Sequence, residues 1–281
     1  MKKTKTPFTA LGAITALPGL LLSCTTLEGR AQDYVEQLPE PEASSGLITE
    51  EDIADLPPIV QRYLRYSRVI GKPRVDSFAF SMEGKIRQSA DAEWMDLVSR
   101  QYNLLSDPAR IYYIRGKWPM TGLDSYMYGE GRMQIKLLNL ITIADVSGPE
   151  MDVSGLATFL NDLIFCPLGY FSVPVQWRQV GDTQAELSLT NREITVTALL
   201  TFDEAGRIVN WETEDRYAEV DGEQLRDRWS TPMDAYDELN GLRIPVSGRG
   251  IHDYDDEPYV YVELDRMRNL EWNVRGLSAT R

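Results

Sequence analysis

The chain has one imidazole, His252, which is the residue a Ser-His-Asp or Cys-His arrangement would have to use as its base. Such an arrangement also needs an activated nucleophile. The sequence has no nucleophile elbow, and Cys166 lies in the apolar run Leu163-Ile164-Phe165-Cys166-Pro167, where burial raises the pKa of a thiol. We therefore predict a buried structural role for Cys166, a surface or loop-edge position for His252, and no catalytic residue.

An acidic cluster follows the histidine, with carboxylates at Asp253, Asp255, Asp256 and Glu257. Calcium prefers several oxygen ligands from a flexible loop, but this spacing lacks the glycine and the distal glutamate of an EF-hand. A solvated acidic turn is the favoured interpretation, so we predict no metal site and no cofactor. A carboxylate pair for glycoside hydrolysis could be drawn from the 43 acidic residues in many ways, and the sequence singles out none.

The overall charge of the chain argues against nucleic acid as a partner. Lys and Arg total 29 against 43 Asp and Glu, which gives a formal net charge of -14. A field of that sign repels phosphate backbones, and no basic stripe with interleaved aromatic residues is present. Nucleic-acid binding is therefore excluded, while the 43% hydrophobic content is that of a globular protein with a real core.

The N-terminus has the pattern of a secretory signal. Three lysines within residues 1–7 precede Phe8–Leu22, an uncharged apolar stretch that is shorter than the ~20 residues of a membrane span. The stretch ends in Leu21-Leu22-Ser23-Cys24, which resembles the lipobox of bacterial lipoproteins. That resemblance implies removal of residues 1–23 and attachment of the chain to a membrane through acyl chains on Cys24. An ordinary cleaved signal and an uncleaved short anchor remain as alternatives.

The next residues bear on location and on domain organisation. Thr25 follows the cysteine, and the absence of Asp there resembles the outer-membrane signal of diderm bacteria, which implies an envelope lipoprotein facing the periplasm. Residues 24–45 are rich in Pro, Glu and Ser and are expected to form a lipidated, flexible tether. Residues 46–281 are expected to form a single globular, β-rich domain.

Within that domain the sequence predicts short helices and many strands. Thr49 can cap a helix with Asp52, Pro57-Pro58 starts a second helical segment, and Ser154–Ile164 has apolar residues at helical spacing. Alternation of period two begins after Gly71, and turn signals recur about every ten residues from Gly181 onward. We predict a mainly β (α+β) fold: a curved antiparallel sheet or half-barrel of about eleven strands with two or three short helices.

Several segments also resemble a family of uncharacterised bacterial envelope proteins. The shared residues are turn, core and edge positions, which raise the expectation about the fold alone; they are Leu56-Pro57, Val60, Arg62-Tyr63-Leu64, Gly122-Leu123-Asp124, Tyr126, Gly129, Gly131, Met133, Lys136, Leu137, Trp229 and Gly241-Leu242-Arg243-Ile244-Pro245. The layout as a whole looks like that of lipoprotein carriers of the LolA and LolB type. That likeness implies a concave sheet face that binds acyl chains.

We therefore expect a non-enzymatic lipoprotein that binds a lipid, or the acyl part of another lipoprotein, inside the curved sheet. The alternative is a structural or partner-docking lipoprotein with a filled core and a protein partner that the sequence does not identify. The residues expected to line the cavity are apolar or aromatic and alternate along strands or share one helix face: Phe78, Phe80, Met82, Ile111, Tyr113, Met133, Ile135, Leu137, Leu156, Phe159, Leu160, Leu163 and Trp177.

Overall fold

The computed structural model describes residues 26–42, 46–116, 119–220 and 222–277. The predicted signal segment 1–23 and the predicted lipidation residue Cys24 lie outside the described residues. No helix in the described ranges is both long and apolar enough to cross a membrane.

One antiparallel sheet dominates the described part of the chain, and it contains 14 strands. In spatial order its strands are β6 (Ile141–Ser147), β5 (Glu130–Leu137), β4 (Met120–Met127), β3 (Ala109–Gly116), β2 (Met95–Leu104), β1 (Ser77–Ile86), β16 (Tyr259–Trp272), β15 (Leu242–His252), β13 (Trp229–Ser230), β10 (Ile208–Thr213), β9 (Ile194–Phe202), β8 (Gln184–Asn191) and β7 (Val175–Gln179), with β14 (Met233–Leu239) paired to β15. A separate two-stranded ribbon contains β11 (Tyr217–Val220) and β12 (Glu223–Arg226).

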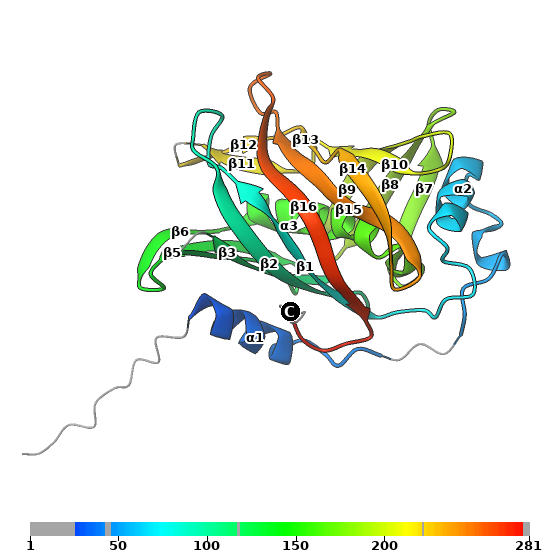
Figure 1. Cartoon of the computed structure of the whole chain (residues 1–281), viewed down its shortest axis with the longest axis horizontal. Coiled ribbons are helices and arrows are strands. Elements are labelled where there is room, and N and C mark those ends of the chain that lie inside the picture. Colours follow the sequence, from blue (N-terminus) through cyan, green and yellow to red (C-terminus); the bar gives the residue numbers. More distant parts are fainter. Residues whose placement is uncertain (1–25, 43–45, 117–118, 221, 278–281) are drawn as a thin grey trace, which may run out of the picture.

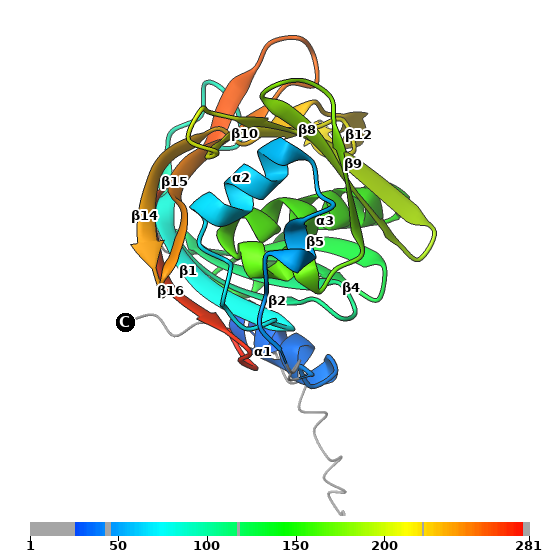
Figure 2. The ribbon, with the colours of Figure 1, turned by 90° about the vertical axis from the view of Figure 1, so that its right-hand side faces the viewer.

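The sheet curls around helix α3 (Pro149–Asp162), which lies on its concave side (Figure 2). Leu156, Phe159 and Leu160 follow helical spacing and are fully buried in the main core. Two 3-10 turns, η2 (Leu163–Phe165) and η3 (Pro167–Phe171), continue the segment to β7. The two edge strands, β6 and β7, are thus joined by the segment that fills the inside of the curve.

The predicted fold class is confirmed: the protein is mainly β, with a curved antiparallel half-barrel and few helices. The strand count is higher than the predicted eleven because very short strands, such as β13 with 2 residues, carry no alternation that a sequence could show. The turn predicted at Asn240-Gly241 is present: it joins β14 to β15, and both of its residues have positive φ (52° and 79°).

The predicted helices near the start of the body also occur. Helix α2 (Pro58–Tyr66) begins at a proline and buries the predicted face of Ile59, Val60, Tyr63 and Leu64. At the other predicted helix, the Asp52 carboxylate accepts hydrogen bonds from the Thr49 N–H at 2.8 Å and from its hydroxyl at 3.0 Å. That segment is a single 3-10 turn, η1 (Glu51–Ile53).

The prediction of a flexible tether over residues 24–45 is wrong for the segment that forms helix α1 (Leu27–Gln37). Leu27, Ala31 and Val35 lie one turn apart and are buried, and Leu38 is buried directly after the helix. This single row of apolar residues packs on the convex face of the sheet (Figure 1), where it covers Ile111 and other side chains of β3 and β4. The folded body therefore begins at α1, ahead of the predicted boundary at residue 46.

Polar contacts hold α1 at both of its ends. The Thr26 hydroxyl oxygen accepts from the Gly29 N–H at 3.0 Å and caps the first turn. The Arg30 guanidinium donates to the Gln134 side chain at 2.7 Å. At the far end the Tyr128 hydroxyl donates to the Gln37 carbonyl at 2.8 Å. These contacts fix both the position and the direction of the helix on the sheet.

A charge placed under α1 should release it. We expect Ala31→Asp to lower the free energy of unfolding by about 2 kcal/mol or more, because an unpaired carboxylate cannot stay buried and the helix loses its apolar contacts. Trypsin should then cleave after Arg30 much faster than in the native chain. The control Gln32→Asp adds the same charge on an exposed position and should leave both measurements close to native. Equal cleavage in the two variants would contradict the docking of α1.

Candidate functional site

A cavity of about 130 Å³ lies on the concave side of the sheet, between α3 and the strands around β1 and β16, and it opens to solvent. That volume is smaller than the roughly 300–1,000 Å³ of pockets for drug-sized ligands, so the cavity has room for part of a ligand, such as a segment of a hydrocarbon chain. Its apolar walls come from the inward faces of the strands and from η2: Phe80, Met82, Ile86, Ile114, Met133, Phe165, Met233, Val262 and Leu264.

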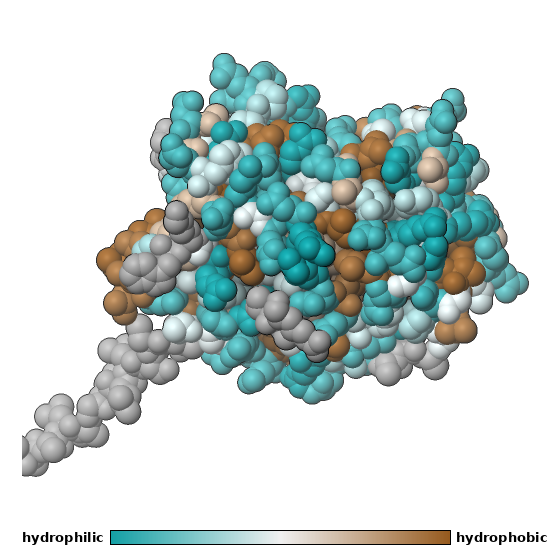
Figure 3. All heavy atoms as spheres, viewed as in Figure 1, coloured by the Kyte–Doolittle hydropathy of each residue, from teal (hydrophilic) through white to brown (hydrophobic). Residues whose placement is uncertain are grey.

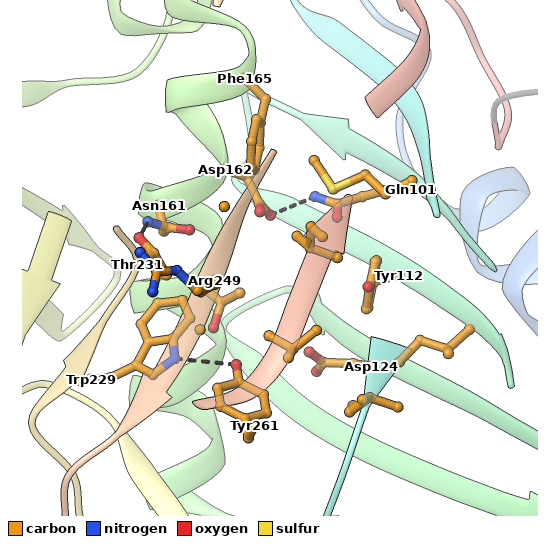
Figure 4. Close-up of a pocket in the computed structure, with 18 of the residues that line it drawn as sticks. Gln101, Tyr112, Asp124, Asn161, Asp162, Phe165, Trp229, Thr231, Arg249 and Tyr261 are labelled. Carbon is orange, nitrogen blue, oxygen red and sulfur yellow. Dashed lines mark hydrogen bonds between the residues drawn. The ribbon is translucent and has the colours of Figure 1, made fainter. Parts of the chain in front are cut away.

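A buried ionic cluster forms one side of the cavity. The Arg110 guanidinium donates to Asp162 at 2.7 Å and to Asp124 at 2.6 Å. The Gln101 amide donates to the same Asp162 oxygen at 2.5 Å, and Figure 4 shows this hydrogen bond at the cavity wall, with Asp124 nearby. Burial raises the pKa of Asp162 against the opposing effect of Arg110, while the two carboxylates hold the guanidinium firmly charged.

The opposite side of the cavity contains a second cation, Arg216, in different surroundings. Its guanidinium lies over the Trp229 ring at 4.3 Å from the centroid and donates to the Thr158 hydroxyl at 2.5 Å. The Trp229 N–H donates in turn to the Tyr261 hydroxyl at 3.2 Å. Among the described residues no carboxylate forms an ion pair with Arg216, and its Nε is buried without a hydrogen-bond partner. Arg216 is therefore a cavity cation that keeps free capacity to bind an anion.

The alternation of β3 decides which of its residues reach the cavity. Arg110, Tyr112 and Ile114 point to the concave side, whereas Ile111 and Tyr113 belong to the apolar cluster under α1 on the convex side. The predicted inward face of this strand was therefore wrong. The error has a physical cause, since both faces of β3 are covered and a strand covered on both sides gives no clear apolar face.

The remaining predicted lining residues fall into three groups. Phe80, Met82 and Met133 line the cavity. Five others are fully buried and fill the main core instead, where α3 meets the sheet: Phe78, Leu156, Phe159, Leu160 and Leu163. Trp177 packs against that core from its rim, and Ile135 and Leu137 are half-buried on β5 outside the cavity. The helix face predicted to line a cavity is thus the contact that holds α3 to the sheet.

The sequence reasoning missed the polar residues of the site, although two of them left a signal. Asp162 interrupts the apolar pattern of the predicted helix Ser154–Ile164, and Arg110 is the one charged residue in the predicted strand Ala109–Ile114. A charge in such a position is rarely buried unless it is paired. Arg216 left no such signal, because it lies in a stretch rich in charged residues.

His252 is more buried than predicted. It is the last residue of β15, its side chain is 13% exposed, and its Nδ1 forms a short hydrogen bond with the fully buried Asp227. Burial lowers the pKa of His252, so the ring is largely neutral at pH 7. The ring also stacks on Tyr261 at 4.0 Å between centroids. No hydroxyl or thiol of a described residue is hydrogen-bonded to its Nε2, so the pair fastens the end of β15 to the segment between β12 and β13.

Cys166 and the acidic cluster after His252 were the other two candidates from the sequence, and both make contacts that serve the fold. Cys166 is buried, as predicted, and burial raises the pKa of its thiol to about 12. In the acidic cluster, Asp253 pairs with Arg228, and Asp255 accepts from the Glu257 N–H at 3.2 Å. Within the described ranges, three or more acidic, histidine or cysteine side chains do not gather in any arrangement suited to a metal ion.

Comparisons with known proteins concern the body of the chain. The model of a family described as a family of unknown function, DUF6544, matches residues 46–264. No curated protein matches the sequence. Among solved structures, a LolA superfamily protein from Nitrosomonas europaea aligns with a TM-score of 0.37 at 10% identity, over 76% of this chain and 91% of that one.

The buried ionic cluster should make one variant strongly pH-dependent. In Arg110→Met the Asp162 carboxylate loses its cation, so we expect a loss of about 3–5 kcal/mol of stability at pH 7. The pKa of Asp162 is already raised in the native fold and should rise further in the variant. Because protonation neutralises the buried group, the loss should shrink as the pH falls toward the usual carboxyl range and grow as the pH rises above it.

Urea unfolding at several pH values measures this effect. Arg132→Met removes a cation from the exposed pair with Asp145 and should cost at most about 1 kcal/mol, with little change between these pH values. The double variant Arg110→Met/Asp162→Asn should recover part of the stability and lose the pH dependence. A pH-independent loss in Arg110→Met would contradict the buried charge at Asp162.

Proposed function

The chain belongs to the DUF6544 family of unknown function, and from this premise we propose that it is a membrane-anchored envelope lipoprotein that binds an amphipathic lipid in its concave cavity, without catalysis. The observation that carries the proposal is the cavity itself, which combines continuous apolar walls with a cation that has no carboxylate partner among the described residues. Ligand pockets generally have this composition, with apolar walls and a few polar groups that orient the ligand.

The apolar part of the cavity suits an acyl chain. Its walls are formed by flexible or branched side chains such as Met82, Ile114 and Met233, which adapt to a hydrocarbon better than to a planar ligand. Each methylene moved from water to such a surface contributes ~0.8 kcal/mol. This space also favours ligand binding over the alternative of a partner-docking protein with a filled core.

The polar part suits an anionic head group. Arg110 is neutralised by two carboxylates and has little left to offer a ligand. Arg216, in contrast, lies over the Trp229 ring, and its Nε is a buried donor without a hydrogen-bond partner. A guanidinium can donate two parallel hydrogen bonds to a phosphate or a carboxylate. We therefore place the head group of the ligand at Arg216 and its hydrocarbon along the walls formed by β1, β3 and β16.

The anchor is proposed from the sequence. Leu21-Leu22-Ser23-Cys24 has the pattern of a lipobox, and two or more acyl chains on Cys24 would hold the protein stably on a bilayer. The residue after the cysteine supports the outer membrane of a diderm cell as the location. A ligand that is itself a lipid would then be available where the protein resides.

A side chain that fills the cavity should distinguish a lipid-binding protein from a partner-docking protein with a filled core. We expect Ile114→Trp to keep its stability within about 1 kcal/mol, because the larger ring enters empty space, and to lower the amount of co-purified lipid severalfold. Native mass spectrometry of residues 26–281, purified without detergent, measures the bound lipid directly. The control Ile135→Trp adds the same ring on a half-buried strand position outside the cavity and should retain the lipid. Equal lipid in both variants, or none in the native chain, would contradict the proposal.

Removing the cavity cation should change head-group preference. We expect Arg216→Gln to weaken binding of an anionic lipid such as phosphatidylglycerol roughly ten- to a hundredfold, since a charge-assisted hydrogen bond contributes roughly 1.5–3 kcal/mol. Binding of zwitterionic phosphatidylcholine should change little. The control is Arg249→Gln, because Arg249 also lines the cavity but already pairs with Asp234 at 2.9 Å. An equal loss of affinity for the two lipids would show that Arg216 does not recognise the head group.

A further inference from the structure

The hairpin of β5 and β6 exposes an unusual amount of apolar surface. Of the eight large apolar side chains that are exposed in the described residues, four lie on it: Leu138 (44% exposed), Leu140 (72%), Ile141 (55%) and Ile143 (50%). Residues 137–144 contain no charge, in a chain whose net charge is -14. Figure 3 shows this patch as an apolar surface at the end of the molecule where the hairpin turns. Such a cluster marks an interaction surface.

The direction of α1 places its first residue at the same end of the molecule. Arg30, in the first turn of α1, contacts Gln134 in the second half of β5, while Gln37 at the end of the helix contacts Tyr128, just before β5 begins. Helix α1 therefore runs opposite to β5, and its N-terminus points toward the turn at Leu138–Leu140 (Figure 1).

The chain length between α1 and the proposed anchor is short. Cys24 precedes Leu27 by three residues, and a fully extended chain spans at most ~3.3–3.6 Å per residue. An acylated Cys24 can therefore stand no more than about 11 Å from the start of α1. Because α1 is docked on the sheet, such an anchor would hold the body close to the bilayer, on the side where α1 begins and the β5–β6 hairpin turns.

We infer that the β5–β6 hairpin inserts its exposed leucine and isoleucine side chains into the bilayer that holds the acyl anchor. The inference rests on the proposed anchor at Cys24. Two features favour a lipid surface as the occupant over a second copy of the chain: the anchor fixes this end of the body at the membrane, and the patch is free of charge, which suits insertion into an apolar phase. Strand β6 is an edge of the sheet, so pairing with a second copy is the outcome that the test must separate.

The test uses the full-length lipoprotein, made in a bacterium that acylates lipoproteins and reconstituted into phosphatidylcholine vesicles. A cysteine introduced by Leu140→Cys is labelled with an environment-sensitive dye, since Cys24 is blocked by the anchor and Cys166 is buried. The matched control is Val180→Cys, also an exposed apolar position (43%), in the turn between β7 and β8 on the far side of the molecule in Figure 1. Intact mass of the mature chain reports acylation separately.

We expect the label at position 140 to shift to the blue and to be quenched severalfold more by spin-labelled lipids than the label at position 180. An acylated chain whose two labels are equally exposed to water would overturn the inference while leaving the anchor intact. A label at position 140 that is shielded from water but not quenched by the lipids would also overturn it and point to a second copy. A mature chain without acyl groups would overturn both the anchor and the inference.

Discussion

With α2 packed into the core near β8, a single helix of 14 residues, α3, remains to cover the rest of the concave face of a sheet that curls through 14 strands. The helix is about 21 Å long, at 1.5 Å per residue, and fills only part of the curve. Where α3 meets the sheet, Phe78 and Leu160 pack without exposure and form the core. The last turns of α3 contribute Thr158, Asn161 and Asp162 to one wall of the cavity, and the strands beside them enclose the remaining space. The same mismatch between helix and sheet therefore produces both the stability of the fold and its candidate site.

The end of α3 also explains why a buried charge is tolerated there. Asp162 closes the helix at the boundary between core and cavity and accepts from Arg110, Gln101 and Asn103, which come from two neighbouring strands. Removing Arg110 would leave the Asp162 carboxylate buried without a cation, so the cluster fixes how α3 sits against β2 and β3. Its charges largely satisfy one another, which leaves Arg216 on the opposite wall as the polar group with capacity for a ligand. The residues that position α3, Asp162 and Arg110, thus differ from Arg216, the residue proposed to bind the ligand.

The sequence predicted features that one local pattern specifies. The turn at Asn240-Gly241, the start of α2 at Pro58 and the apolar face of α3 all follow from backbone preferences or from a single period. The sequence-based prediction failed where a segment is covered on both of its faces. On β3, α1 covers one face and the cavity lies on the other, so alternation could not show that Arg110 rather than Ile111 faces inward. Arg216 lies far in sequence from the walls it completes, and only the long-range pairing of strands brings it to them.

The most consequential error concerned α1, and its origin is the narrowness of the apolar stripe. One buried residue per turn, at Leu27, Ala31 and Val35, is surrounded by Glu, Gln, Arg and Asp, so the mean composition is that of a disordered linker. A helix with so little apolar surface gains its stability from the sheet it packs against rather than from its own propensity. With α1 docked, the chain between the proposed anchor at Cys24 and the body shortens from a long tether to a few residues. For a chain anchored in that way, the direction in which α1 lies on β3 and β4 would set the orientation of the body at the membrane.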